Sequence, residues 1–311
     1  MSRVSIIIPT YNRKDLLRET IASVFNQIFS DWELIVVDNG STDGTKEMLQ
    51  AEYANRIRCL VIPHSEMPAD ARNAGIQAAQ GPYLSFLDSD DIWVPEKLVV
   101  QIRALDEDAD AGWSYSNALC FGPGLSGREH LYADWRMRSG RIFEHLLNGN
   151  CVTTSSVVVR KSCLDSVGCF DASAGLRTAE DYELWLRLAW RFPARAITKP
   201  LVLYRMYSQN LSNANGFNAD PAFLALDRVA AKLGLPTQVQ RKARAALQLA
   251  SSRATVRDHP AEAIAWLSDA CREDPYNIRA RWYQALCRIG GTQGLSSWLN
   301  LEQRAKQLLS R

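Results

Sequence analysis

Three aspartates follow a short apolar segment of the chain: "YLSFLDSDDIW" (83–93) places Asp88, Asp90 and Asp91 within four positions. One of them could cap the helix predicted from "IWVPEKL", but a helix start needs only one cap. Three neighbouring carboxylates repel one another, and each raises the pKa of the others unless a cation neutralises them. Oxygen ligands that are completed by substrate phosphates favour Mg²⁺ or Mn²⁺, so the sequence predicts a divalent metal ion here.

Three other positions carry groups that could act on a substrate. Asp38 ends the apolar segment "ELIVVD" and precedes a turn; because it cannot easily cap the next helix, we expect it to face a substrate. Arg72 could bind phosphates, hold an aspartate in place or simply lie on the surface. Asp181 has capping-box spacing from Thr178, but beside Glu180 it could equally be a general base at the rim of a pocket.

Other ligand patterns are weak. The seven cysteines include no Cys-x-x-Cys pair and the four histidines lack helical ligand spacing, which disfavours a disulfide framework or a zinc site. The segment "GPGLSG" (122–127) matches Gly-x-Gly-x-x-Gly, but no apolar helical face follows it, so we do not interpret it as a dinucleotide-binding loop. A metal ion in this protein would therefore need oxygen ligands.

The first part of the chain alternates apolar strands with amphipathic helices. Strands that are buried on both sides and separated by helices predict an α/β fold with a mostly parallel, doubly wound, Rossmann-like sheet. In such a sheet ligands bind beyond the carboxyl ends of the strands, where Asp38 and Asp88 lie, and a nucleoside diphosphate could lie across this edge. The strands are predicted at 4–9, 33–38, 57–63 and 82–88, and the helices at 13–27 and 69–80.

A second α/β region follows, and after it a helical one. We predict helices at 95–105, 161–167 and 179–192, and strands at 112–119, 152–159 and 201–207. We therefore assign a first domain to 1–212, with halves 1–118 and 119–212, a linker to 213–221 and an all-helical region to 222–311. In that region the segment 260–289 resembles one tetratricopeptide unit, although a plain helical hairpin fits as well.

Charge is distributed unevenly along the chain. Residues 1–221 carry 22 Lys and Arg against 27 Asp and Glu, whereas 222–311 carry 14 against 7. The basic tail is either a solvated face or a contact with an anionic membrane surface. We expect no nucleic-acid partner, because Trp266, Trp282 and Tyr283 fit helix packing better than base stacking. The cationic residues of its central helical stretch are Arg241, Lys242, Arg244, Arg253 and Arg257.

The sequence also bears on location. The hydrophobic content of 47% is enough for a globular core, yet no apolar run approaches the roughly 18 residues that span a bilayer. The N-terminus shows no signal-peptide pattern. We therefore expect a cytoplasmic protein, which would be peripheral at the inner face of the membrane if the basic tail binds lipid.

Four segments occur in a fixed order along the chain: "SIIIPTYNR", "VVDNGSTDGT", "ARNAGIQAAQGPYLSFLDSDD" and "AEDYELWLRLA". With them, the chain resembles a family 2 glycosyltransferase of the A-type fold over about residues 3–207. The resemblance implies roles for particular residues. These are Pro9, Thr10, Tyr11 and Asp38 at the base and ribose of a nucleoside diphosphate sugar, Arg72 near them or the phosphates, Asp88 toward the ribose, Asp90 on the metal, Asp91 and Glu180 at the donor sugar, and Asp181 as catalytic base.

The implied reaction is an inverting transfer that depends on Mn²⁺ or Mg²⁺. Its acceptor would be a glycan or a lipid-linked hydroxyl, in glycan or surface polysaccharide synthesis. Two alternatives stay open, a nucleotidyltransferase and a non-catalytic sugar-binding or scaffold protein. The chain departs from many members of the family at Tyr207, where they carry histidine, and at Asn39, where they carry a second aspartate.

Overall fold

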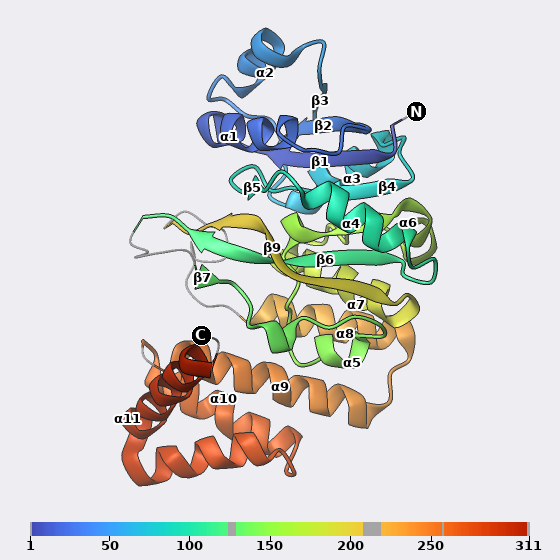
Figure 1. The fold of residues 1–311 in the computed structure, drawn as a ribbon. Helices are drawn as coiled ribbons and strands as arrows, with labels where there is room; N and C mark the ends of the chain where they lie inside the picture. The colour runs from blue at the N-terminus through green and yellow to red at the C-terminus, as the bar shows by residue number, and fades with distance from the viewer. Residues whose placement is uncertain (1, 124–128, 208–218, 257, 310–311) are drawn as a thin grey trace. The chain divides into compact units, whose positions relative to one another are not determined.

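A computed structural model describes residues 2–123, 129–207, 219–256 and 258–309. Residues 1–146 and 150–214 form one compact unit, and residues 147–149 and 215–311 form a second. The segment "GPGLSG" and the predicted linker 213–221 lie mostly outside the described residues. Each unit is built differently, the first around a sheet and the second from helices (Figure 1).

The first unit contains a sheet whose described strands follow the order β3-β2-β1-β4-β8-β6-β9-β5, with β7 paired to β6. Its first four strands in sequence pair in parallel, as predicted. They are β1 (Val4–Thr10), β2 (Trp32–Asp38), β3 (Arg58–Val61) and β4 (Tyr83–Phe86). Because all four run in one direction, their carboxyl ends form a common edge.

The rest of the sheet is mixed. β8 (Val158–Arg160) runs antiparallel to both β4 and β6 (Trp113–Phe121), whereas β9 (Ala194–Arg205) is parallel to β6. Two short strands, β5 (Ile92–Trp93) and β7 (Glu129–His130), pair antiparallel with β9 and β6. The predicted α/β fold is therefore confirmed, with a parallel half and a mixed half.

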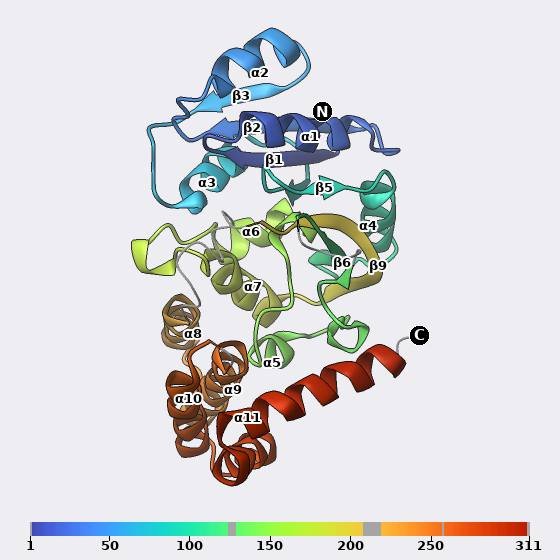
Figure 2. The same cartoon turned by 90° about the vertical axis from the view of Figure 1, so that its left-hand side faces the viewer.

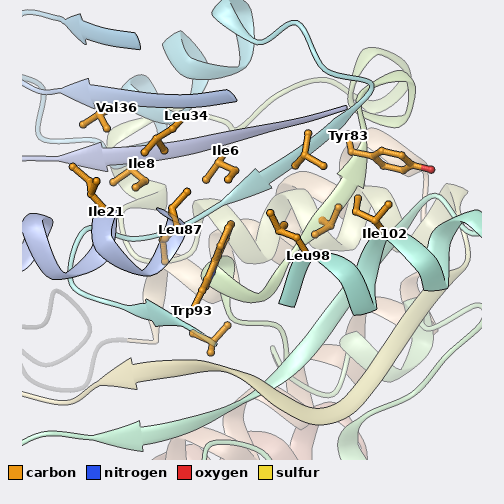
Figure 3. Packing of buried hydrophobic residues seen from close by; sticks show 14 of the residues in the cluster. Ile6, Ile8, Ile21, Leu34, Val36, Tyr83, Leu87, Trp93, Leu98 and Ile102 are labelled. Atoms are coloured by element: carbon orange, nitrogen blue, oxygen red, sulfur yellow. The ribbon is translucent and has the colours of Figure 1, made fainter. Parts of the chain in front are cut away.

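Helices cover both faces of the sheet, and Figure 2 shows α3 and α7 on one side of the strands and α4 on the other. Alternate residues of β1 point to opposite faces: Ile6 and Ile8 belong to a core that includes Ile21 and Leu98 (Figure 3). The intervening Ile7 meets α3, where a Cβ on Gly75 would lie 2.4 Å from its Cγ2. The helices of this unit are α1 (Lys14–Phe25), α2 (Thr45–Tyr53), α3 (Pro68–Ala78), α4 (Lys97–Asp106), α5 (Phe143–Leu146), α6 (Lys161–Val167) and α7 (Glu180–Arg191).

One predicted strand is largely replaced by a turn. Residues 152–159 were expected to be extended, but Thr154–Ser156 form a short 3₁₀ turn, η2, and the strand begins only at Val158. Short 3₁₀ turns at Asp134–Arg136 (η1) and Ala174–Leu176 (η3) complete the unit. Ser and Thr hydroxyls often bond to nearby groups and so compete with strand pairing, which the β propensity of "VTTSS" does not reveal.

The second unit is helical, as predicted, over its described residues. It consists of α8 (Asp220–Leu233), α9 (Thr237–Thr255), α10 (Pro260–Glu273) and α11 (Ile278–Leu309), which has non-helical backbone at Gly291. A separate core includes Ala245, Leu267 and Tyr283. Asn277 caps α11, because its Oδ1 accepts the Ala280 N–H at 3.0 Å. Within the described residues, no helix combines the length and the apolar character needed to cross a membrane.

Candidate active site

A cavity of about 340 Å³ opens at the carboxyl edge of the parallel strands, and its size suits a small-molecule ligand. The predicted site residues that line it are Pro9, Thr10, Tyr11, Arg72, Asp88, Asp90, Asp91, Glu180 and Asp181. Asp38 is not among the described lining residues; it is buried at the end of β2, where its Oδ1 accepts the Ser41 N–H at 2.9 Å. The structure thus brings together nine of the ten residues that the sequence singled out.

Arg72 joins two parts of the cavity. This buried side chain of α3 bonds to Asp88 through Nη2 at 2.7 Å and to Glu180 through Nη1 at 2.8 Å. Burial alone would lower the pKa of the guanidinium, but the charges of Asp88 and Glu180 outweigh it and raise the pKa. Of the three interpretations of Arg72, the one in which it holds carboxylates describes the structure.

Neighbouring groups donate hydrogen bonds to the carboxylates of the aspartate segment. Asp90 Oδ2 accepts hydrogen bonds from Arg13 Nη1 at 2.7 Å and from the Tyr207 hydroxyl at 2.8 Å. Asp91 accepts the Ser155 hydroxyl at 2.6 Å and the Arg205 N–H at 3.0 Å. Burial, followed by the charge of neighbouring aspartates, still raises the pKa of Asp91. Capping of the next helix is excluded as a role, because α4 begins only at Lys97.

The donor atoms of this segment fit a hard divalent ion that takes most of its ligands from elsewhere. No group of three or more His, Cys, Asp or Glu side chains in the described parts of the chain is arranged to hold a metal ion by itself. The cavity instead offers single carboxylates, with Asp88 partly exposed and Asp90 beside it. Mg²⁺ is commonly held by one or two carboxylates together with substrate phosphates and water.

Asp181 lies in the first turn of α7 and lines the cavity. Its Oδ2 accepts the Thr154 hydroxyl at 2.8 Å, and its Oδ1 accepts the Tyr182 N–H at 2.6 Å. Burial, then the charge of Glu180, raises the pKa of Asp181 to about 7. The capping-box alternative is wrong: Thr178 has a φ of +78° and the N-cap is Ala179, without a side-chain cap bond.

Several polar atoms of the cavity residues are left without partners. Thr10 Oγ1, Arg72 Nε and Glu180 Oε2 are buried and have no hydrogen-bond partner within the described structure. Buried polar atoms are nearly always bonded to protein or water, so unsatisfied ones at a cavity are consistent with a polar ligand. All three belong to residues that line this cavity.

Comparison with known proteins agrees with this architecture. Residues 5–165 match the model of glycosyl transferase family 2. The chain is 32% identical over 218 residues to the Escherichia coli UDP-Glc:alpha-D-GlcNAc-diphosphoundecaprenol beta-1,3-glucosyltransferase WfaP, covering 70% of this chain and 82% of that protein. The chain belongs to glycosyl transferase family 2. It is therefore a glycosyltransferase, which decides against a nucleotidyltransferase or a non-catalytic scaffold.

Two solved structures share the fold of this glycosyltransferase. TarS 1–349 of S. aureus in complex with UDP-GlcNAc matches with a TM-score of 0.65 at 18% identity, over 98% of this chain and 92% of that one. The mannosyltransferase PcManGT from Pyrobaculum calidifontis, in complex with GDP-Man and Mn²⁺, matches with a TM-score of 0.58 at 21% identity, over 97% and 84% of the two chains. The A-type glycosyltransferase fold predicted from sequence is confirmed.

The cavity of the glycosyltransferase also includes His64 and Ser65, which sequence reasoning missed, and both contact residues that it had named. Tyr11 stacks on His64, with ring centroids 4.1 Å apart, and His64 Nδ1 lies 3.1 Å from the Asn39 carbonyl oxygen. Asn39 exchanges two hydrogen bonds with the backbone of Ser65, at 2.7 and 2.8 Å. A signal existed for His64, since it follows β3 and the carboxyl end of β3 lies at the same edge as those of β1 and β2.

Proposed function

We propose that this glycosyltransferase transfers a sugar from a nucleoside diphosphate sugar to an acceptor hydroxyl, with inversion at the anomeric carbon, during polysaccharide synthesis. The observation that carries the proposal is the environment of Asp181. A carboxylate that lines a ligand-sized cavity and has a pKa near 7 is suited to accept a proton under physiological conditions. Its neighbours in the cavity supply the remaining functions.

Donor binding would use both sides of the cavity. Pro9, Thr10 and Tyr11 follow β1, and the half-exposed ring of Tyr11, stacked on His64, offers an aromatic face to a nucleobase. We assign Asp38 and Asp88 to the ribose side, as the resemblance implies, and Asp91 and Glu180 to the donor sugar. Arg72 fixes Asp88 and Glu180 relative to each other, so the two sides keep their spacing.

Asp90 would hold Mn²⁺ or Mg²⁺ together with diphosphate oxygens and water. When bound, the ion would supply positive charge that stabilises the departing nucleoside diphosphate. Tyr207, at the position where many members of the family have histidine, donates to Asp90 and so orients it. In this proposal, metal binding depends on one protein carboxylate, that of Asp90. Hydrogen bonds from Arg13 and Tyr207 fix its orientation.

The transfer itself would be a single displacement. Asp181 accepts the proton of the acceptor hydroxyl as that oxygen forms a bond to the anomeric carbon. The bond from this carbon to the phosphate oxygen breaks on the opposite face, and its electron pair leaves with the nucleoside diphosphate. One displacement inverts the configuration of the sugar carbon.

The test combines donor identification with removal of the base. A panel of UDP- and GDP-sugars, with and without Mn²⁺, is screened by thermal shift, and NMR then reports the anomeric configuration of the product. Asp181→Asn should bind the donor normally but lose transfer by about 10²–10⁴-fold. Asp165→Asn, at an exposed position on α6, is the control. Transfer that survives in Asp181→Asn, or retention of configuration, would contradict the proposal.

A second proposal concerns the acceptor. The relative WfaP acts, by its name, on a diphosphoundecaprenol-linked sugar, and we propose a lipid-linked glycan acceptor here too. Such an acceptor is reached at a membrane surface, so we also propose peripheral contact with the inner face of the membrane. The described cationic residues first considered for this contact are partly engaged within the second unit: Arg241 pairs with Glu273, and Arg244 pairs with Asp227.

A better candidate for the membrane contact is one face of α11 before Gly291. Ile278, Trp282 and Ile289 are spaced by four and seven residues, which places them on one side of the helix, and all three are exposed. Arg281 and Arg288 are exposed beside them. Apolar and aromatic residues flanked by arginine are typical of helices that lie on an anionic bilayer. A second copy of this face would bring like charges together, which disfavours self-association.

Liposome co-sedimentation tests this face. The protein should bind vesicles that contain phosphatidylglycerol, bind neutral vesicles less, and dissociate as salt is raised. Ile289→Gln should weaken binding roughly tenfold, since about 1.4 kcal/mol of apolar burial is lost. Ile264→Gln, at a half-exposed position on α10, is the matched control. Absence of binding at low salt, or a dimer that Ile289→Gln dissociates, would rule the membrane contact out.

A further inference from the structure

The reversed direction of β8 places an unexpected element at the active-site edge. Leu84 pairs with Val159 and Ser85 with Val158, so the chain that precedes β8 lies where the chain that follows β4 begins. The segment that follows β4 carries Asp88 and Asp91, and the segment that precedes β8 is the η2 turn. The turn is buried, although it consists only of hydroxyl residues.

Two adjacent hydroxyls of this turn bind carboxylates from different parts of the chain. Thr154 Oγ1 donates to Asp181 Oδ2 at 2.8 Å, which links the turn to α7. Ser155 Oγ donates to Asp91 Oδ2 at 2.6 Å and accepts the Asp88 N–H at 3.1 Å, which links it to the aspartate segment. The turn therefore connects the proposed base with the segment proposed to hold donor and metal.

The turn is held firmly by its own contacts. The Trp93 indole N–H donates to the Ser155 carbonyl at 2.8 Å, and the Gln101 side chain donates to the Ser156 carbonyl at 2.8 Å. Ser156 closes the turn through two bonds to the Thr153 carbonyl, from its N–H and its hydroxyl. Because these bonds are buried, they hold the turn, and with it the Thr154 hydroxyl, in place relative to the sheet.

We propose that Thr154 is a positioning residue for the transfer reaction: its hydroxyl fixes the orientation of the Asp181 carboxylate and favours the ionised form that accepts the proton. This inference rests on the proposed role of Asp181 as the base. Thr154 itself makes no bond to the substrate in this scheme. The η2 turn then sets the distance between the base and the aspartate segment.

The electrostatics around Asp181 agree with this role. Burial and the charge of Glu180 raise the pKa of Asp181, whereas the hydrogen bond from Thr154 and the charge of Arg72 act in the opposite direction. Tyr132 also faces Asp181, and burial raises the pKa of its phenol to about 12, so it stays neutral. Removal of the Thr154 hydroxyl therefore raises the pKa of Asp181 further.

The test is the pH dependence of kcat/KM in Thr154→Val. Because the base must be ionised, a higher pKa moves the acidic limb of the profile to higher pH, by about 0.5–1 pH unit for one lost hydrogen bond. The loss of activity should therefore be larger at pH 6.5 than at pH 9. Thr154→Ser, which keeps the hydroxyl, should restore the limb, and Thr198→Val, at an exposed position on β9, is the matched control.

Each outcome separates this inference from the proposed function. An unshifted profile in Thr154→Val, or activity lost equally at every pH, would overturn the role of Thr154 even if Asp181→Asn is inactive. A shift that Thr154→Ser does not rescue would mean a structural effect of the turn and would also overturn it. If Asp181→Asn keeps its transfer activity, the assignment of the base fails first, and that result is read independently of Thr154.

Discussion

Arg13 and Arg72 each hold one carboxylate of the aspartate segment, whereas Asp91 receives hydrogen bonds from Ser155 and the backbone. The sequence predicted that crowded aspartates need a compensating cation, and the pKa values of Asp90 and Asp91 are indeed raised, chiefly by burial. It did not predict Arg13 as that cation. Arg13 and Asp90 are 77 residues apart, and only the fold brings them together.

The raised pKa of Asp181 has a cost in stability. Its folded pKa of about 7 lies above the ordinary aspartate value of 3.8, so the native state binds more protons than the unfolded state between those values. Stability therefore falls as the pH rises through this window. Asp181→Asn removes the penalty and can still accept the Thr154 hydrogen bond.

We expect the free energy of unfolding of Asp181→Asn to exceed that of the wild type by roughly 2–3 kcal/mol at pH 8. This range allows for solvent screening of the partly exposed side chain. At pH 4 the two proteins should be nearly equal. Urea titrations at the two pH values measure this difference. A gap that is the same at both pH values would show that folding does not raise the pKa of Asp181.

At the scale of elements, the periodic segments were predictable and the short ones were not. The strands β1 and β2 and the helices α1, α3 and α7 lie where the order of apolar segments and helical segments predicted them. The η2 turn was not predictable, because its geometry depends on Asp181 and Asp91, which are distant in sequence. The antiparallel direction of β8 likewise depends on strand partners rather than on its own residues.

The start of α4 carries a second buried titratable group, and its burial affects the stability of the protein. Lys97 is fully buried, with Nζ 3.3 Å from Ser85 Oγ and 4.0 Å from the Trp93 ring centroid. Desolvation lowers its pKa well below 10.5. The unfolded state then binds more protons in the window between the lowered pKa and 10.5, so stability rises with pH there.

Lys97→Met should therefore stabilise the protein at neutral pH, by about 1–3 kcal/mol, because the cost of burying an amine is removed. The advantage should shrink as the pH approaches 10.5. Lys232→Met, on the exposed side of α8, is the control. Chemical unfolding at pH 6.5, 8 and 9.5 measures the trend, and a destabilised variant at all three would mean that the lysine contributes a favourable buried contact.

At the scale of the whole molecule, the described residues of the two units have separate cores, and the residues that line the cavity all lie between Pro9 and Arg205. The sequence predicted the helical nature of the second unit from its apolar pattern. It could not assign a role to that unit, since exposed side chains such as Ile289 have meaning only relative to a partner.

The separate cores lead to a prediction for Leu267, which is buried in the core of the second unit. Leu267→Ala should destabilise that unit by about 2–4 kcal/mol. Hydrogen exchange should become faster in α9, α10 and α11 and stay unchanged in β1, β2 and β4. Affinity for a nucleoside diphosphate should be unaffected, and a clear loss would mean that the second unit supports the cavity.

If Asp90 holds a metal ion as proposed, its ion pair with Arg13 should make the binding of metal and nucleotide cooperative. A lone Mn²⁺ ion that approaches Asp90 meets the positive charge of Arg13 at 2.7 Å from the same carboxylate, whereas a diphosphate neutralises both cations. The two ligands should therefore strengthen each other, and by equal factors. Calorimetric titration of Mn²⁺ with and without UDP measures that factor, and Arg13→Gln should bind the lone ion more tightly and show weaker coupling. Equal coupling in both proteins would show that the Arg13 guanidinium does not contribute to the cooperative binding of Mn²⁺ and UDP.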